Sequence, residues 1–416
     1  MTRYKIIPLL TFLVIACGSQ PSPGIIKPLL EPTRTEGFSP LSPKEKAYYA
    51  NAIEPLYQSL LLRTGFNGSI LVAKNGEIVF EDYHGSANFQ TKEPIDSNTT
   101  FHVASVSKTF TATVILKLME EGKLSIGDKV EKYLPSFPYP NITIEHLLDH
   151  RSGLPKYDHF MEGSRTEAYK VKNKKGRMVT RYRSIKVPLT FSGYATNDDV
   201  LQYLATKRPN LDVATDRMRK FYYSNTNYAL LALIVEKITG MSFPTYMTTY
   251  VFKPLGMSHT YIFSQKDTAN YQPSYYANKR AFKLEKLDCI YGDKNVYTTT
   301  RDLLLWDRAL YLGTFVSTKT LEMAFQPYSI GESNYGLGWH LFVKPPEPTI
   351  VYHNGWWHGN NATFKRLVAD TATVIILGNK FNSNIYRAGK MSSVFTGHVD
   401  TTDLEHEEVP GVGGHQ

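Results

Sequence analysis

The chain has 416 residues and a formal net charge of +9 at pH 7, and 42% of its residues are hydrophobic. A chain of this length and apolar share buries one large core or two coupled ones, which excludes a mostly disordered protein. Its only two cysteines, Cys17 and Cys289, exclude a disulfide-rich scaffold.

The first residues have the pattern of an export signal peptide. Arg3 and Lys5 precede an apolar run from Ile6 to Ala16 that is too short to cross a bilayer, so residues 1–16 are excluded from the fold. Cys17 follows small and aliphatic residues that resemble the lipobox at which bacterial lipoproteins are cut and acylated. We therefore expect a membrane lipoprotein, anchored by lipid on Cys17 and facing the periplasm or the outside of a bacterial cell. A plain signal peptide followed by an incidental cysteine is the alternative.

Two further segments stand out by composition. Residues 17–44 begin with the lipidated cysteine and continue as a stretch rich in Pro and Ser without a hydrophobic period, which predicts a flexible tether. Between Arg165 and Lys186, nine Lys and Arg residues stand against a single acid, Glu167, so this segment carries nearly all of the net charge. It is either a solvated basic loop or a contact for an anionic envelope surface of polymers or lipid headgroups. Nucleic acid is not an expected partner of an exported, lipid-anchored chain.

The folded body is expected to begin with a hairpin. Residues from Ser69 to Tyr83 alternate in polarity and break at Asn75-Gly76, which predicts two antiparallel strands. Ser105 then opens a segment with apolar residues at helical spacing that ends near Gly122. We expect this helix to pack on the sheet and to hold Ser105 in its first turn.

The middle of the chain, from about Phe137 to about Tyr291, has a mainly helical pattern with long connections. Helices are predicted at Ile144–Leu148, Asn197–Leu204, Tyr228–Ile238 and Asp302–Leu310. Strands are predicted at Thr349–His353 and Ala362–Gly378, the latter pair turning at Ala369-Asp370.

Strands at both ends of the chain with helices between them predict an α+β fold. We expect an antiparallel sheet flanked by helices, with an inserted, mainly helical domain and the active site at the seam. The expected parts are a domain formed by residues 45–136 and 292–400, the insertion at 137–291 and a C-terminal tail at 401–416.

Three short polar signatures supply the parts of one reaction centre, namely Ser105-Val106-Ser107-Lys108, Tyr223-Ser224-Asn225 and His353-Asn354-Gly355. The first places a hydroxyl and an amine on one helix face, because residues three apart are neighbours there. The second adds a phenol and a carboxamide, and the third adds an imidazole followed by flexible backbone. A nucleophile, its base, a proton relay and an oxyanion site can be assembled from these groups, which is typical of a serine hydrolase.

The position of Ser105 at a helix start favours this chemistry, since free N–H groups and the positive end of the helix dipole face a developing negative charge. Its own N–H forms half of an oxyanion hole. Lys108 accepts the serine proton only if its amine is neutral, or else it holds a neighbouring tyrosine as a phenolate. Either shift needs roughly three pKa units, or about 4 kcal/mol. Gly355 lets substrate lie close to the strand edge, which leaves the Trp356 N–H as the second oxyanion donor.

A metal site formed by His353 and His358 is not expected, because no carboxylate or cysteine lies at ligand spacing. We expect no cofactor.

These signatures and several further stretches resemble the serine β-lactamase and penicillin-binding-protein superfamily, in particular its class C β-lactamase-like branch, which includes DD-peptidases and esterases. The match runs from about Phe66 to Gly378 and also covers Leu147–Leu154, Pro254–Met257, Gly292–Lys294 with Thr298-Thr299, and Tyr335–Trp339. The resemblance implies a β-lactamase/transpeptidase-like fold. It also implies that Ser105 is the acylated nucleophile, that Lys108 and Tyr223 transfer protons, and that Asn225 contacts the substrate amide.

One departure from the family pattern bears on the substrate. His353 replaces the Lys of the K-T-G motif, so a permanent cation that would bind a substrate carboxylate becomes a group that is mostly neutral above pH 6.5. The same loss should leave the pKa of Tyr223 higher than in K-T-G relatives, unless Lys294 or Arg151 compensates. We expect acyl-enzyme hydrolysis of esters or amides, with D-amino-acid peptides and β-lactams as further candidates. The alternatives are a peptidoglycan DD-peptidase and a non-catalytic envelope protein that retains the pocket.

Overall fold

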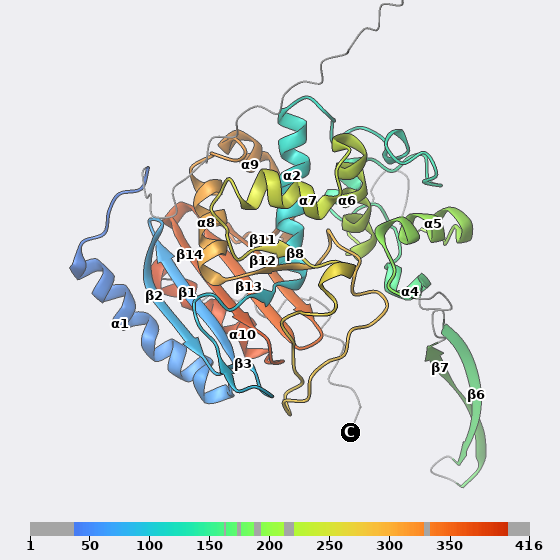
Figure 1. Cartoon of the computed structure of the whole chain (residues 1–416), viewed down its shortest axis with the longest axis horizontal. Helices are drawn as coiled ribbons and strands as arrows, with labels where there is room; N and C mark the ends of the chain where they lie inside the picture. Colours follow the sequence, from blue (N-terminus) through green and yellow to red (C-terminus); the bar gives the residue numbers. More distant parts are fainter. Residues whose placement is uncertain are drawn as a thin grey trace, which may run out of the picture.

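The computed structural model describes residues 37–161, 164–172, 176–186, 193–211, 220–327 and 333–397 (Figure 1). The predicted signal peptide, Cys17 and the predicted tail at 401–416 lie outside these residues, as does the predicted tether up to residue 36. The predicted end of the tether at Lys44 is wrong. Helix α1 (Pro43–Leu60) already begins at Pro43, where Ser42 and Glu45 form a capping box.

A seven-stranded antiparallel sheet forms the centre of the molecule, in the order β10-β11-β12-β13-β14-β1-β2. Its strands are β1 (Gly68–Lys74), β2 (Glu77–His84), β10 (Ser333–Tyr335), β11 (His340–Phe342), β12 (Ile350–Trp357), β13 (Asn360–Leu367) and β14 (Ala372–Gly378). The first hairpin joins the C-terminal strands where β1 pairs with β14, from Gly68 opposite Gly378 to Lys74 opposite Ala372. The expected turns at Asn75-Gly76 and Ala369-Asp370 are confirmed.

Both faces of this sheet are covered, which explains why β1 reads as a continuous apolar run. Ile70 and Val72 point to a core formed with α1 and with α10 (Asn384–Arg387) and its neighbours. The alternate residues, Leu71 and Ala73, point to the larger core beneath α2 (Ser107–Glu120) and α8 (Thr300–Tyr311). In Figure 1, α1 lies on the opposite side of the sheet from α8.

A second group of helices packs beside α2. It contains α3 (Ile144–Leu148), α4 (Tyr157–Met161), α5 (Asn197–Lys207), α6 (Asn225–Thr239) and α7 (Phe243–Met247). A small sheet consists of β5 (Phe101–His102), β9 (Val296–Thr298) and β8 (Tyr261–Ile262). A short ladder pairs β3 (Ser86–Asn88) with β4 (Glu93–Pro94), and the remaining short helices include α9 (Thr318–Ala324) and α11 (Ser393–Thr396). The expected α+β fold is confirmed, and the four predicted helices lie where the apolar periodicity placed them. No helix among the residues placed by the structure is long and apolar enough to span a membrane.

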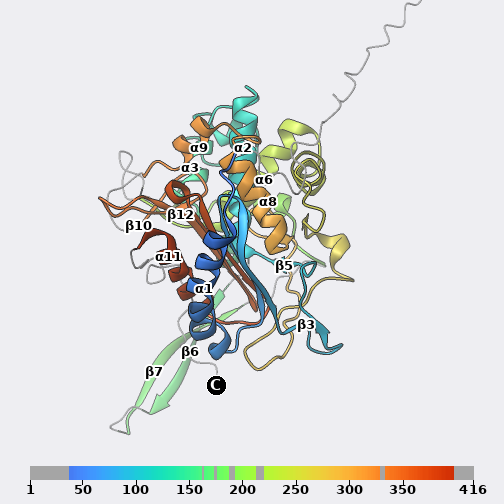
Figure 2. The same cartoon turned by 90° about the vertical axis from the view of Figure 1, so that its left-hand side faces the viewer.

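The basic segment forms a β-hairpin where its charge suggested a loop, and its described side chains at 168–172 and 176–181 are exposed or half-exposed. Strands β6 (Ser164–Lys172) and β7 (Met178–Lys186) pair over nine positions and project from the body, as the two views in Figures 1 and 2 agree. In these two segments the β-favouring residues Tyr169, Val171 and Val179 alternate with charged or polar residues. Such alternation favours strands over a loop. The insertion is therefore less uniformly helical than its periodicity predicted.

Candidate active site

Ser105 lies in a short 3-10 turn (Ala104–Val106) between strand β5 and helix α2, two residues before the α-helix begins, whereas the sequence predicted it inside the first helical turn. Ala104 has a φ of 48°, a left-handed conformation that non-glycine residues adopt only when the surroundings enforce it. Fully buried Lys108 places its Nζ 3.0 Å from Ser105 Oγ and donates to the main-chain oxygen of Asp293 at 2.8 Å. The structure thus brings the predicted hydroxyl and amine within hydrogen-bonding distance.

Tyr223 reaches the same point from the segment that precedes α6. Lys108 Nζ lies 5.0 Å from the centroid of the Tyr223 ring. The Tyr223 ring packs against His150 at 4.2 Å between centroids and lies 6.4 Å from the ring of His353. Residues from four separate parts of the chain therefore converge around Tyr223.

Asn225 is the first residue of α6, so the structure places it one step further into the helix than predicted. Its side-chain oxygen is buried and has no hydrogen-bond partner among the residues that the structure describes. Since buried polar groups are almost always paired, this oxygen can accept a hydrogen bond from the N–H of a bound substrate.

His353 lies in the middle of β12, because the strand continues to Trp357 instead of ending at His353 as predicted. Its Nδ1 is 2.6 Å from the carbonyl oxygen of Asn354, which can only accept, so Nδ1 carries a proton. Nε2 lies 3.2 Å from the hydroxyl of Tyr335, which donates to it when the ring is neutral. Burial, and then the charges of His340 and Lys108, lower the pKa of His353 well below its ordinary value. His353 is therefore a neutral group at pH 7.

Gly355 has a different role from the predicted one. A Cβ at this position would lie 2.2 Å from the carbonyl oxygen of Val103 and 3.1 Å from the nitrogen of Ser105. The glycine thus permits β12 to contact the backbone that carries the nucleophile, and no space for substrate is needed to explain it. Trp356 follows directly on this strand segment next to Ser105, and the role of its N–H as an oxyanion donor stays a prediction.

Sequence reasoning gave no role to His150, Tyr335 and His340, although two of the family-like stretches contain or adjoin them. All three rings lie between 4.2 and 6.2 Å from the Tyr223 ring. No local spacing could have found them, because they come from a loop before α4 and from β10 and β11. The expected compensating cations have other partners: Lys294 binds the hydroxyl of Tyr157, and Arg151 lies 3.6 Å from Asp149.

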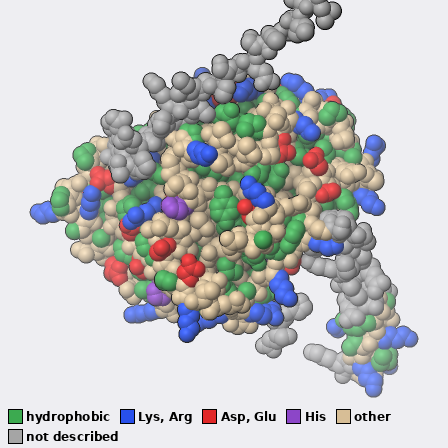
Figure 3. Space-filling model, in the orientation of Figure 1, with side chains coloured by type: hydrophobic (Ala, Val, Ile, Leu, Met, Phe, Trp, Pro, Cys, Tyr) green, Lys and Arg blue, Asp and Glu red, His purple; other side chains and the backbone are tan. Residues whose placement is uncertain are grey.

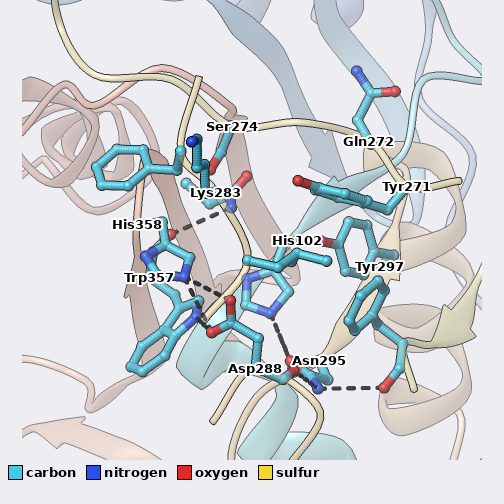
Figure 4. Close-up of a pocket in the computed structure, with 14 residues that line it drawn as sticks. His102, Tyr271, Gln272, Ser274, Lys283, Asp288, Asn295, Tyr297, Trp357 and His358 are labelled. Atoms are coloured by element: carbon cyan, nitrogen blue, oxygen red, sulfur yellow. Dashed lines mark hydrogen bonds and ion pairs between the residues drawn. The ribbon is translucent and has the colours of Figure 1, made fainter. Parts of the chain in front are cut away.

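A small pocket opens beside the segments that carry the site (Figure 4). It contains about 340 Å³ of space, partly open to solvent. Asp288 lies at its wall and accepts hydrogen bonds from Trp357 Nε1 at 2.9 Å and from His358 at 3.0 Å. Burial alone would raise the pKa of Asp288, but the hydrogen bond and charge of His358 bring it below its ordinary range. His358 is thus a hydrogen-bond partner of Asp288, and no cluster of three or more metal-ligating side chains occurs in the described ranges.

A serine hydroxyl at a helix start, a buried lysine one turn on and a tyrosine against that lysine define a class of proteins, the serine enzymes that work through an acyl-enzyme. A family model described as Beta-lactamase matches residues 63–390. The chain therefore belongs to the β-lactamase family, whose members are serine hydrolases.

Relatives and solved structures agree with this assignment. Penicillin-binding protein 4* of Bacillus subtilis (strain 168) is 34% identical over 353 residues, which make up 80% of this chain and 72% of that protein. The putative penicillin-binding protein PbpX of the same organism is 29% identical over 292 residues, 68% of this chain and 63% of that one. An octameric penicillin-binding protein homologue from Pyrococcus abyssi has a TM-score of 0.68 at 23% identity, covering 85% of this chain and 79% of that one. A class C β-lactamase has a TM-score of 0.65 at 20% identity, covering 87% and 99%. Because these two solved structures are only 23% and 20% identical to this chain, they show that it shares their fold.

Proposed function

We propose that the protein hydrolyses ester or amide substrates through an acyl-enzyme on Ser105. Ser105 Oγ attacks the carbonyl carbon while its proton passes to Lys108 and Tyr223, which return it to the leaving alcohol or amine. Water then hydrolyses the ester on Ser105. The observation that carries this proposal is the 3.0 Å distance between Lys108 Nζ and Ser105 Oγ, with the Tyr223 ring next to the same amine.

The site lacks a positive charge at His353, which favours substrates whose binding does not require a cation to pair with a carboxylate group. His353 is buried and its pKa is lowered well below the ordinary value, so it supplies no positive charge at pH 7. We therefore expect simple esters and amides to be turned over more efficiently than penicillins. The backbone N–H groups of Ser105 and Trp356 stabilise the oxyanion of the tetrahedral intermediate.

Labelling with a fluorophosphonate followed by mass spectrometry tests the nucleophile. We expect one adduct on Ser105, loss of label in Ser105→Ala and loss of p-nitrophenyl ester turnover with it. Ser107→Ala is the matched control, because the Ser107 hydroxyl is buried and accepts the main-chain N–H of Val296 at 3.0 Å. Turnover by Ser105→Ala at the parent rate, or silence of the parent with every ester and β-lactam probe, would refute the assignment. Silence would favour the binding protein without turnover.

A peptidoglycan DD-peptidase is the second candidate, because the B. subtilis relatives are named as penicillin-binding proteins. A panel of esters, D-Ala-D-Ala peptides and nitrocefin separates the candidates. Release of D-Ala at rates comparable to ester turnover would favour the peptidase, whereas ester turnover alone would favour the esterase.

We also propose that the chain acts in the bacterial cell envelope, anchored by lipid on Cys17, and that the basic segment from Arg165 to Lys186 contacts an anionic surface there. The lipobox-like residues before Cys17 and the concentration of charge support this. Fractionation of cells that express the parent or Cys17→Ser tests the anchor. After a high-salt wash, which releases a charge-driven contact of the basic segment, we expect the parent in membranes and the variant in the soluble fraction, and equal distribution would contradict the anchor.

A further inference from the structure

The hairpin of β6 and β7 is unusual because no other element in the described part of the chain packs over it as a second layer. Its strands pair from Ser164 opposite Lys186 to Lys172 opposite Met178, and Figures 1 and 2 both show it standing away from the body. An isolated two-stranded sheet is at best marginally stable in water. Its side chains that the structure describes, at 168–172 and 176–181, are all exposed or half-exposed. The rest of the chain buries none of these described side chains, which leaves them open to a surface of another molecule.

Cations and apolar groups share both faces of this hairpin. Directly opposed residues lie on one face, so Lys172 shares a face with Met178, and Tyr169 shares the other with Arg181. Met178 is 57% exposed and Tyr169 is 37% exposed, which places them among the few large hydrophobic side chains that are exposed in the described part of the chain. Figure 3 shows basic and hydrophobic side chains side by side on this projection.

We infer that the hairpin docks on a lipid bilayer that contains anionic lipids, an inference that rests on the proposed envelope location. The face that carries Lys170, Lys172 and Met178 lies on the membrane, and its two exposed lysines contact headgroup phosphates, which attract basic segments near a membrane surface. The thioether of Met178 enters the interface between headgroups and acyl chains, where side chains with an apolar body are stabilised.

The apolar side chains decide between a bilayer and a soluble anionic polymer. A polymer of phosphates would neutralise the cations and leave Met178 in water, whereas a bilayer accommodates both kinds of group. The hairpin also carries no acid among the described side chains at 168–172 and 176–181, so nothing there opposes approach to a negative surface.

Vesicle co-sedimentation tests the inference with the processed chain carrying Cys17→Ser, so that no lipid anchor contributes. The vesicles contain either phosphatidylcholine alone or phosphatidylcholine with 30% phosphatidylglycerol. Lys170→Glu/Lys172→Glu is compared with the control Lys253→Glu/Lys319→Glu, which reverses two exposed lysines elsewhere on the body. Each cation near an anionic surface is worth about a factor of five in binding.

We expect binding to the anionic vesicles alone, a decrease with salt, and a loss of roughly 25-fold or more in the hairpin variant but not in the control. Met178→Ser should weaken binding severalfold at unchanged charge. Equal loss in both charge variants, binding to neutral vesicles, or binding only to soluble polyphosphate would overturn the inference. Ester hydrolysis by each variant shows separately that the fold and the proposed reaction are intact.

Discussion

His150 holds the short segment that carries Tyr223. Its carbonyl oxygen accepts the N–H of Tyr222 at 2.8 Å, and its Nδ1 accepts the N–H of Ser224 at 3.2 Å and the amide of Asn227 at 3.1 Å. Burial, and then the positive charge of Lys108, lower the pKa of His150 well below its ordinary value. The ring is therefore neutral, with its proton on Nε2, and acts as a fixed acceptor and a wall for the phenol. We assign His150 a positioning role.

The positioning role predicts different results for two substitutions. His150→Leu removes the acceptor for two donors, and we expect kcat for ester hydrolysis to fall about 100-fold with little change in KM, as misplacement of a reacting group does. His150→Asn keeps an acceptor near Nδ1 and should recover most of the loss. His259→Leu, at an exposed position, is the control. Equal losses in the Asn and Leu variants, or a loss confined to KM, would contradict the assignment.

Gly355 is the second residue on which the site depends. An added methyl group would lie 2.2 Å from the backbone of Val103, which cannot move without displacing Ser105. We expect Gly355→Ala to lower the rate of Ser105 acylation by roughly 100-fold or more, because a shift of about 1 Å has that effect. Burst-phase ester kinetics measure this rate. Gly127→Ala, where the nearest atom is 3.7 Å away, should be neutral, and a neutral Gly355→Ala would disprove the contact.

Among the elements, α8 is fixed to the sheet by a buried ion pair. Asp307 on α8 accepts from Arg366 Nε on β13 at 2.5 Å and from the hydroxyl of Thr373 on β14 at 2.5 Å. Burial raises the pKa of Asp307 although the charge of Arg366 opposes the rise. The pair thus fixes the position of α8 relative to the sheet. Each buried charge is stabilised by its partner of opposite sign and would be costly to bury alone.

Breaking this pair on one side should be costly. We expect Asp307→Ala to lower the free energy of unfolding by about 3–5 kcal/mol, since it leaves the Arg366 guanidinium buried without its carboxylate. Asp307→Ala/Arg366→Met should be less destabilised than the single variant. Glu81→Gln, which weakens the exposed pair of Glu81 with Arg301, should cost about 1 kcal/mol or less. Urea unfolding measures these variants together with Arg366→Met, and a double variant whose destabilisation equals the sum of the two single variants would disprove the coupling.

The same elements show how far the sequence alone leads. The first hairpin, α6 and α8 were predictable because their signals are local: Asn75-Gly76 forms the turn, and apolar residues recur at helical spacing. The hairpin of β6 and β7 was not, because its charges hide the alternation of its strands. At the site, the three signatures identified groups that the structure brings together. The partners of Tyr223 and the contact of Gly355 with Val103 depend on tertiary packing, for which a single sequence holds no local signal.

At the scale of the whole molecule, the active site exists only when both ends of the chain meet. The nucleophile follows β5, the phenol comes from the helical side and the closing strand is β12, which is joined to the N-terminal hairpin through β13 and β14. Assembly of this seam buries three neutral imidazoles. Burial lowers the pKa of His102 to about 3 and lowers those of His150 and His353 well below their ordinary value.

These imidazoles make the stability of the fold depend on pH. The unfolded chain binds their protons near pH 6.5 and the folded chain does not, so their contribution is complete above pH 6.5 and is lost as the pH falls toward the folded-state values. Asp149 acts in the opposite direction, because burial raises its pKa to about 7. The slope of the free energy of unfolding against pH therefore combines contributions of opposite sign. The contribution of a single histidine is obtained only by comparing a variant with its parent.

For that comparison we choose His102→Gln. His102 lies three residues before the nucleophile, and burial lowers its pKa to about 3, so it stays neutral in the folded chain at pH 5.5. Between pH 7.5 and 5.5 the parent should lose about 1.4 kcal/mol more of its free energy of unfolding than the variant, the linkage expected of one histidine that stays neutral when folded. Urea unfolding at the two pH values, under otherwise equal conditions, measures this difference. His259→Gln, at an exposed position, should leave the pH dependence of the parent unchanged. If His102→Gln destabilises the protein equally at both pH values, the imidazole is protonated in the fold and the seam does not exclude its charge.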